Sequence, residues 1–140
     1  MSDRAFVDTN VWVYAHLDQD GDAKGSTATT LVENIPSCVI STQVLNEYYA
    51  VMLKNHAAEA WIRRNLENMI RHCEVQIISL AVIRATYAIR DAYGFSYWDS
   101  LMVASALQAQ CAVLYSEDLQ HGQRIDGRLR IVNPFLEQAG

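Results

Sequence analysis

The chain has 140 residues, 51% of them hydrophobic, and a formal net charge of −5. This length suits one compact domain, residues 1–140, whose apolar core needs no covalent staples. The negative charge argues against a protein that coats nucleic acid by electrostatics alone, which requires an excess of Lys and Arg. It does not exclude an enzyme that acts on nucleic acid, because clustered carboxylates would explain the charge and a bound cation would reverse it locally.

The sequence shows no membrane-spanning or export segment. Charged residues interrupt every apolar run well before the roughly 20 residues that a membrane helix needs, and the N-terminus lacks the pattern of a secretory signal. We therefore expect a soluble, cytoplasmic protein with no membrane partner. Three cysteines, Cys38, Cys73 and Cys111, are too few and too widely spaced for a disulfide scaffold, and we expect them to be small buried side chains.

Short apolar segments alternate with helical patterns along the chain. In chain order, the patterns predict a strand at 4–8, a helical segment at 11–17, a polar break at 18–21, a helix at 23–34, a strand at 38–40, helices at 43–54 and 57–72, a strand at 75–78, helices at 81–93 and 97–110, and strands at 113–115 and 129–132. Thr42 and Ser96 are the expected N-caps of the helices that follow them, and Gly94 is an expected C-cap. A polar loop through His121 and Gly122 precedes the last strand.

This alternation indicates βαβ units rather than hairpins. We therefore predict an α/β fold, a three-layer α/β/α sandwich with a central, mainly parallel sheet. In such sheets, ligands bind beyond the carboxyl ends of the strands, near the point where the strand order reverses. Asp8 and Asp118 both follow predicted strands, which places two carboxylates at that edge.

Two further acids lie on predicted helices. Glu47 comes three residues after Val44 and four before Val51, so it lies on or beside an apolar stripe, where an ionised carboxylate is expensive unless it is paired or binds metal. The alternative is a glutamate at the edge of the stripe that bends toward solvent, or one that caps a neighbouring backbone. Asp99 has the spacing of a capping box with Ser96, and capping alone would explain it. Its helix is nearly all apolar, however, and must pack against the sheet.

Asp8 and Asp118 also have an ordinary explanation, because aspartates are common where a strand enters a turn. The coincidence of four acids at one sheet edge favours a functional cluster. Four carboxylates so close together cannot all remain ionised without a cation. Oxygen donors without His or Cys favour Mg²⁺ or Mn²⁺ over zinc. Such ions activate water and neutralise charge on a phosphoryl group, which matches phosphodiester hydrolysis.

At the level of motifs, the chain resembles the PIN-domain nucleases, and most of all the VapC-type toxins of prokaryotic toxin–antitoxin pairs. The resemblance extends from Phe6 to Phe135. The residues that carry it are Phe6-Val7-Asp8-Thr9-Asn10, then Glu47 on a helix, then Tyr97-Trp98-Asp99 at the start of an apolar helix, and finally Tyr115-Ser116-Glu117-Asp118.

The resemblance implies an endoribonuclease that binds Mg²⁺ or Mn²⁺. It carries over four residues as metal ligands and catalytic groups: Asp8, Glu47, Asp99 and Asp118. Asn10 and Ser116 carry over as hydrogen-bonding support for these acids or for the attacking water; the family usually has Thr at the second position, and Ser keeps the hydroxyl. The resemblance also implies an RNA substrate, a homodimer, and an antitoxin that lays a segment into the acidic site.

Two other functions remain open from the sequence. A regulatory module with the same fold would bind RNA or a partner protein without cutting, although such a module has no need to keep four acids. A phosphatase with Asp8 as its nucleophile would normally have a second carboxylate close behind, and Asn10 occupies that position. Neither the RNA that is cut, nor a toxin as opposed to a housekeeping role, nor the number of metal ions can be read from these residues.

Overall fold

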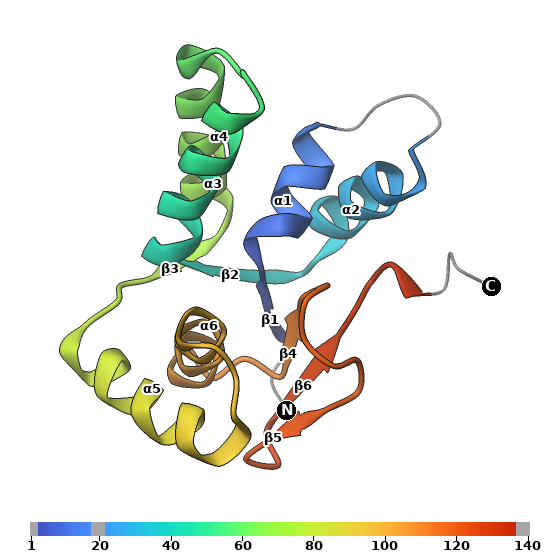
Figure 1. The fold of residues 1–140 in the computed structure, drawn as a ribbon. Helices are drawn as coiled ribbons and strands as arrows, with labels where there is room; N and C mark the ends of the chain where they lie inside the picture. The colour runs from blue at the N-terminus through green and yellow to red at the C-terminus, as the bar shows by residue number, and fades with distance from the viewer. Residues whose placement is uncertain (1–2, 18–21, 137–140) are drawn as a thin grey trace.

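The computed structural model of the protein describes residues 3–17 and 22–136, so the predicted polar break at 18–21 lies outside the described residues (Figure 1). The elements, in chain order, are β1 (Arg4–Val7), α1 (Thr9–His16), α2 (Ala23–Asn34), β2 (Ser37–Ser41), α3 (Thr42–Lys54), α4 (Glu59–His72), β3 (Glu74–Gln76), α5 (Leu80–Tyr93), α6 (Tyr97–Gln108), β4 (Val113–Tyr115), β5 (Arg124–Ile125) and β6 (Leu129–Val132).

One sheet runs through the middle of the structure in the order β3-β2-β1-β4-β6-β5. The pairs from β3 to β6 are parallel, and β5 pairs antiparallel with β6. The chain builds outward from β1 through β2 to β3, and then returns to place β4 on the other side of β1. The strand order therefore reverses between β1 and β4, which is where ligands bind in open parallel sheets.

Helices cover both faces of this sheet. Figure 1 shows α1 to α4 on one side and α5 with α6 on the other. In the layer of four, α1 packs on α2 and on α3, whereas α5 packs mainly on α6. This arrangement confirms the predicted three-layer α/β fold with a mainly parallel sheet.

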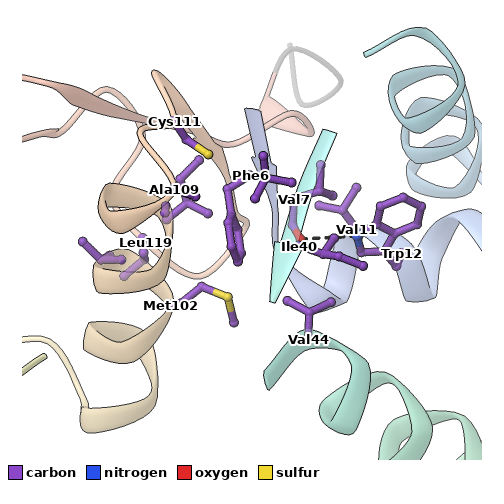
Figure 2. Packing of buried hydrophobic residues seen from close by; sticks show 14 of the residues in the cluster. Phe6, Val7, Val11, Trp12, Ile40, Val44, Met102, Ala109, Cys111 and Leu119 are labelled. Atoms are coloured by element: carbon purple, nitrogen blue, oxygen red, sulfur yellow. Dashed lines mark hydrogen bonds between the residues drawn. The ribbon is translucent and has the colours of Figure 1, made fainter. Parts of the chain in front are cut away.

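The core forms where β1 lies between the two helical layers. Figure 2 shows Phe6 facing Met102 of α6 on one side, with Val11 and Trp12 of α1 on the other side. The indole nitrogen of Trp12 donates to the carbonyl oxygen of Val7 at 3.3 Å, which joins α1 to the end of β1. From Ser100 to Leu107, every residue of α6 is buried, so this part of the helix belongs to the core.

The ends of several helices follow from local chemistry. Ser96 caps α6 by accepting from the backbone N–H of Asp99 at 3.1 Å, and Gly94 ends α5 in the left-handed conformation at φ 73°, both as predicted. The expected N-cap at Thr42 is wrong. Ser41 caps α3 by accepting from Val44 N–H, while the Thr42 hydroxyl accepts from Ile78 N–H at 3.2 Å. Both residues are hydroxyl-bearing, and β2 ends one residue later than the pattern suggests.

The segment predicted as a polar loop before the last strand contains one strand that was not predicted, β5. In this hairpin, β5 pairs with β6 around a tight turn at Asp126 and Gly127, which have φ values of 53° and 66°. The backbone N–H of Arg128 donates to Ile125 O at 3.0 Å and closes the turn. Asp-Gly is the preferred sequence for such a turn, but β5 has only two residues and gives no alternating pattern.

Two cysteines lie closer together than the sequence suggests. Cys111 is buried as expected, whereas Cys38 and Cys73 are only partly buried and their sulfur atoms are 2.8 Å apart. The parallel register that pairs Val39 with Glu74 brings these thiols together across β2 and the start of β3. Within residues 3–17 and 22–136, no helix is long and apolar enough to cross a membrane.

Candidate functional site

Asp8 directly follows β1 and caps the N-terminus of α1. Its Oδ1 accepts from the backbone N–H of Thr9 at 2.6 Å, and its Oδ2 accepts from the hydroxyl of Ser116 at 2.9 Å. The backbone N–H of Asp8 donates to Tyr115 O at 3.0 Å, which continues the pairing of β1 with β4. The side chain is therefore fixed at the junction of the two strands, and the residue is only 7% exposed.

The pKa of the Asp8 carboxyl group is well above its ordinary value. Burial, the largest cause, raises its pKa to about 7, against the opposing effect of the hydrogen bonds from Ser116 and Thr9. The nearby charges of Asp118 and Glu47 raise the pKa further. Such a carboxylate is poorly stabilised by the protein alone, and a cation would favour its ionised form.

Glu47 projects from α3 toward α1 and is held at both oxygens. Its Oε1 accepts from the hydroxyl of Thr9 at 2.8 Å, and its Oε2 accepts from the side-chain amide of Gln43, one turn earlier, at 3.1 Å. The same amide group donates to the backbone oxygen of Trp98 at 3.2 Å. Gln43 therefore connects α3 to the first turn of α6.

Asp118 lies three residues beyond β4 and is the most exposed of the four acids. Its Oδ2 accepts from the side-chain amide of Asn10 at 3.1 Å, and its backbone N–H donates to the Ser116 hydroxyl at 3.3 Å. Partial burial raises its pKa, and the charges of Asp99, Glu117 and Glu47 act in the same direction.

A separate ion pair anchors the loop that carries Asp118. Glu117 accepts from the ammonium group of Lys24 on α2 and from the phenol of Tyr14 on α1, the latter at 2.8 Å. The Lys24 ammonium also lies over the rings of Tyr14 and Phe135. Glu117 thus faces away from the other acids and fixes the segment between β4 and Asp118 against two helices.

All four predicted acids line one pocket of about 320 Å³ at the switch point of the sheet. Asp99, which is half-buried, enters from the first turn of α6. The remaining lining residues include Thr9, Asn10 and Gln43, together with the apolar edges of α3 and α6. The structure therefore brings together acids that are separated by up to 110 positions in the chain.

The donor set of this pocket suits a hard divalent cation. Carboxylates, with amide and hydroxyl oxygens beside them, are the ligands that Mg²⁺ and Mn²⁺ prefer. In the described part of the chain, no three His, Cys, Asp or Glu side chains stand ready to hold an ion as they are. Glu47 is turned to Thr9 and Gln43, and Asp118 to Asn10, which keeps the like charges apart. An ion would have to draw the carboxylates together.

Sequence reasoning missed Thr9 and Gln43 as members of this site. The sequence indicates only a cap or turn role for Thr9, because the residue that its hydroxyl contacts, Glu47, is 38 positions away. For Gln43 a signal did exist, because residues four apart on a helix are neighbours and Gln43 precedes Glu47 by four. Asn10 and Ser116, proposed as supporting residues, donate to Asp118 and Asp8 respectively.

Comparison with known proteins places this geometry in a family context. A sequence model of the PIN domain matches residues 5–125, which include all four acids. No curated protein matches the sequence.

Several solved structures share the fold. A toxin–antitoxin complex from Klebsiella pneumoniae is 21% identical and has a TM-score of 0.72, with 93% of this chain and 97% of that chain covered. VapC20 from Mycobacterium tuberculosis, a sarcin–ricin loop cleaving toxin, is 21% identical over 81% of this chain and 89% of its own, with a TM-score of 0.64. VapBC2 from Rickettsia felis, bound to promoter DNA, is 18% identical over 93% and 99%, with a TM-score of 0.64.

Proposed function

Because the chain belongs to the PIN domain family, we propose that it is a metal-dependent endoribonuclease that hydrolyses RNA phosphodiester bonds at the acid pocket. The observation that carries this proposal is the gathering of Asp8, Glu47, Asp99 and Asp118 around one pocket at the switch point of the sheet. Four acids from four different elements repel one another, and a structural role does not require them to meet.

The proposed cofactor is Mg²⁺ or Mn²⁺, held by these four carboxylates. When bound, such an ion lowers the pKa of water and neutralises negative charge on a phosphoryl group. Asp8 is the central ligand in this proposal, because both of its oxygens are already oriented by Thr9 and Ser116. A ligand fixed in this way loses little conformational freedom when it binds.

The other side chains of the pocket orient the acids and handle the proton. Thr9 and Gln43 hold Glu47 at the side of the pocket next to α6, which also positions Asp99. Asn10 holds Oδ2 of Asp118 and leaves its Oδ1 available to accept the proton of an attacking water. No protein nucleophile is needed.

The test is cleavage of a mixed pool of structured RNAs by purified protein, with Mg²⁺ or Mn²⁺ and with EDTA. Asp8→Asn is run in parallel and guards against contaminating ribonuclease. Glu67→Gln removes one exposed carboxylate on α4, outside the pocket, and is the charge-matched control. We expect cutting by the wild type and Glu67→Gln with metal, and a loss of at least 100-fold in Asp8→Asn.

Two results would overturn the nuclease proposal. Equal cutting by the wild type and Asp8→Asn assigns the activity to a contaminant. Metal binding without cutting of any RNA indicates a module that binds RNA or protein and does not cleave. A model phosphomonoester, assayed beside the RNA, detects a phosphatase with Asp8 as its nucleophile.

We further propose that the protein is the toxin of a type II toxin–antitoxin pair and that the antitoxin occupies the acid pocket. The support is the fold shared with structures described as toxin–antitoxin complexes. A pocket of four carboxylates attracts a basic side chain from a partner segment. The test is inhibition of RNA cleavage by the protein encoded next to this gene. A neighbouring gene product that neither binds nor inhibits contradicts the toxin role and favours a housekeeping nuclease.

The family resemblance also implies a homodimer, and we propose that assembly here. Ile77, which follows β3, and Leu80, the first residue of α5, are 63% and 67% exposed, and such an assembly would give their apolar surface a partner. Light scattering of the wild type is expected to give twice the chain mass. A monomer at micromolar concentration contradicts the proposal.

A further inference from the structure

A second, largely apolar pocket of about 530 Å³ lies directly beside the acid pocket. Ile78 and Leu101 form part of its wall, and the two pockets share four residues: Gln43, Glu47, Ala50 and Trp98. A chain-like molecule whose reacting group lies among the acids would therefore extend its next unit into the apolar pocket.

Trp98 stands at the boundary between the two pockets. Trp98 is 62% exposed, although it directly precedes the half-buried acid Asp99 on α6. Tyr97 contacts the indole edge-to-face, with ring centroids 5.2 Å apart, which restricts the orientation of the ring. An exposed, oriented indole beside a candidate nuclease site is a surface on which a nucleobase can stack.

Gln43 supplies a second, independent observation. It is only 7% exposed, and its Oε1 is buried and has no hydrogen-bond partner within residues 3–17 and 22–136. Its amide nitrogen is already engaged by Glu47 and by the backbone oxygen of Trp98. A buried acceptor without a donor is unfavourable, and a ligand that brings an N–H group would satisfy it.

We propose that the apolar pocket binds the nucleobase next to the scissile phosphate, stacked on Trp98 and donating an N–H to Oε1 of Gln43. This inference rests on the proposed ribonuclease function and names the part of the RNA that the site reads. A protein partner is disfavoured as the occupant, because polar side chains interrupt the apolar wall and the pocket leads straight into the acid site. Trp98 and Gln43 are positioning residues in this proposal.

The experiment uses one oligonucleotide from the RNA pool with a mapped cut, and a copy in which the base on either side of that cut is removed. Trp98→Ala, Trp98→Phe and Tyr87→Ala are compared with the wild type. Tyr87 is an exposed aromatic on α5, 58% exposed, and is the matched control. Because Trp98 is exposed, its replacement by alanine should not disturb folding, which thermal unfolding verifies.

We expect Trp98→Ala to raise KM about 10-fold with kcat changed by less than about twofold, because the stacking of one base typically contributes at this level. Trp98→Phe should keep most of the affinity, and Tyr87→Ala should match the wild type. On RNA that lacks the flanking base, wild type and Trp98→Ala should have equal KM, because the contact is already absent. Gln43→Met removes the Oε1 acceptor and also the amide that holds Glu47, so kcat should fall on both RNAs, whereas KM should rise on the intact RNA only.

A second readout does not depend on cleavage. In EDTA, the oligonucleotide should quench the fluorescence of the wild type and of Tyr87→Ala but not that of Trp98→Ala. Quenching without cleavage supports the subsite and refutes the nuclease. Cleavage with unchanged KM in Trp98→Ala, or with equal KM for intact and base-free RNA, refutes the subsite alone. Unchanged RNA kinetics together with lost dimerisation or lost antitoxin binding would show that the pocket is a protein interface and would overturn the proposal.

Discussion

Two polar clusters lie next to each other where α1 meets α3, and they differ in almost every respect. Glu47 belongs to the acid pocket, whereas its neighbour Tyr48 is fully buried and contacts His16, further along α1. Asn65 donates to the Tyr48 hydroxyl at 3.0 Å, and the same hydroxyl is hydrogen-bonded to Nδ1 of His16 at 2.6 Å. This second cluster, Tyr48, His16 and Asn65, is neutral, and the buried phenol oxygen is satisfied.

The two clusters have opposite responses to pH. Burial lowers the pKa of His16, so the unfolded chain binds its proton more readily, and stability is lost as the pH falls through the ordinary range of histidine. Because the pKa of Asp8 is raised, the folded chain keeps this proton to a higher pH than the unfolded chain does. Stability is therefore lost as the pH rises from about 4 to 7. The neutral cluster stabilises the fold because its buried polar groups are hydrogen-bonded. The ionised acid pocket lowers the stability of the fold, which is common where residues serve a function.

The largest effect is expected from breaking the neutral cluster. Tyr48→Ala removes a fully buried aromatic side chain and its hydrogen bonds, and should lower the free energy of unfolding by about 3–5 kcal/mol. Urea denaturation measures the loss. Tyr48→Phe, which keeps the ring, should lose only about 1 kcal/mol and cleave RNA at the wild-type rate. A slower Tyr48→Phe would link this cluster to the active site and weaken the comparison.

The acid pocket should respond in the opposite direction. Asn fits the place of Asp8, and its oxygen can keep the bond from Thr9 N–H while its NH2 group donates to the Ser116 hydroxyl in place of accepting from it. Asp8→Asn should therefore stabilise the metal-free protein by about 1–3 kcal/mol at pH 8. The gain should shrink as the pH falls from 7 to 4, because the folded wild type then binds a proton that the unfolded chain still lacks. Denaturation at several pH values measures this dependence. A variant that is less stable than the wild type at pH 8 contradicts the raised pKa.

A bound metal ion should offset the loss of stability that the ionised acid pocket causes. At ten times its dissociation constant, Mn²⁺ should stabilise the wild type by about 1.4 kcal/mol, which raises Tm by about 3–5 °C. Asp8→Asn should show little or no rise, and Glu67→Gln should match the wild type. Thermal scans with Mn²⁺ and with EDTA provide the measurement. An equal rise in Asp8→Asn places the ion elsewhere.

The smallest change in stability is expected at Asn10, which makes an exposed hydrogen bond to Asp118. Asn10→Ala should change the free energy of unfolding by no more than about 0.5 kcal/mol, yet lower RNA cleavage about 10-fold, because the orientation of Asp118 is lost. Both quantities come from the same protein preparation. A change in stability with unaltered cleavage would assign Asn10 a structural role.

Much of this architecture was predictable because it depends on local patterns. The alternation of apolar strands with helices predicts the parallel sheet, and Asp8 and Asp118 at strand ends place two acids at its edge. Gly94 and Ser96 mark helix ends by chemistry that acts within a few residues. The short strand β5 was not predicted because two residues are too few to show an alternating apolar pattern, although Asp126-Gly127 is a typical turn sequence.

The contacts that could not be predicted depend on register and side-chain direction. The hydroxyl of Thr9 meets Glu47, and the thiol of Cys38 meets that of Cys73, across 38 and 35 positions respectively. A shift of one residue in the register of β2 and β3 would separate the two thiols, and no local pattern shows that register. The contact of Thr9 with Glu47 depends instead on how α1 packs on α3. The roles of Asp8 and Asn10 remain predictions that the variants above test. The roles of Glu47, Asp99, Asp118 and Ser116 also remain predictions.

The bond from Ser116 to Asp8 joins positions 108 residues apart, as does the bond from Asn10 to Asp118. During synthesis, a nascent chain that has exposed β1, β2 and β3 still lacks Asp118 and the hydroxyl that orients Asp8. The acid pocket therefore cannot be completed until β4 has left the ribosome and inserted beside β1. A ribosome that translates this message is not exposed to a finished acid pocket on its own growing chain until Asp118 has emerged.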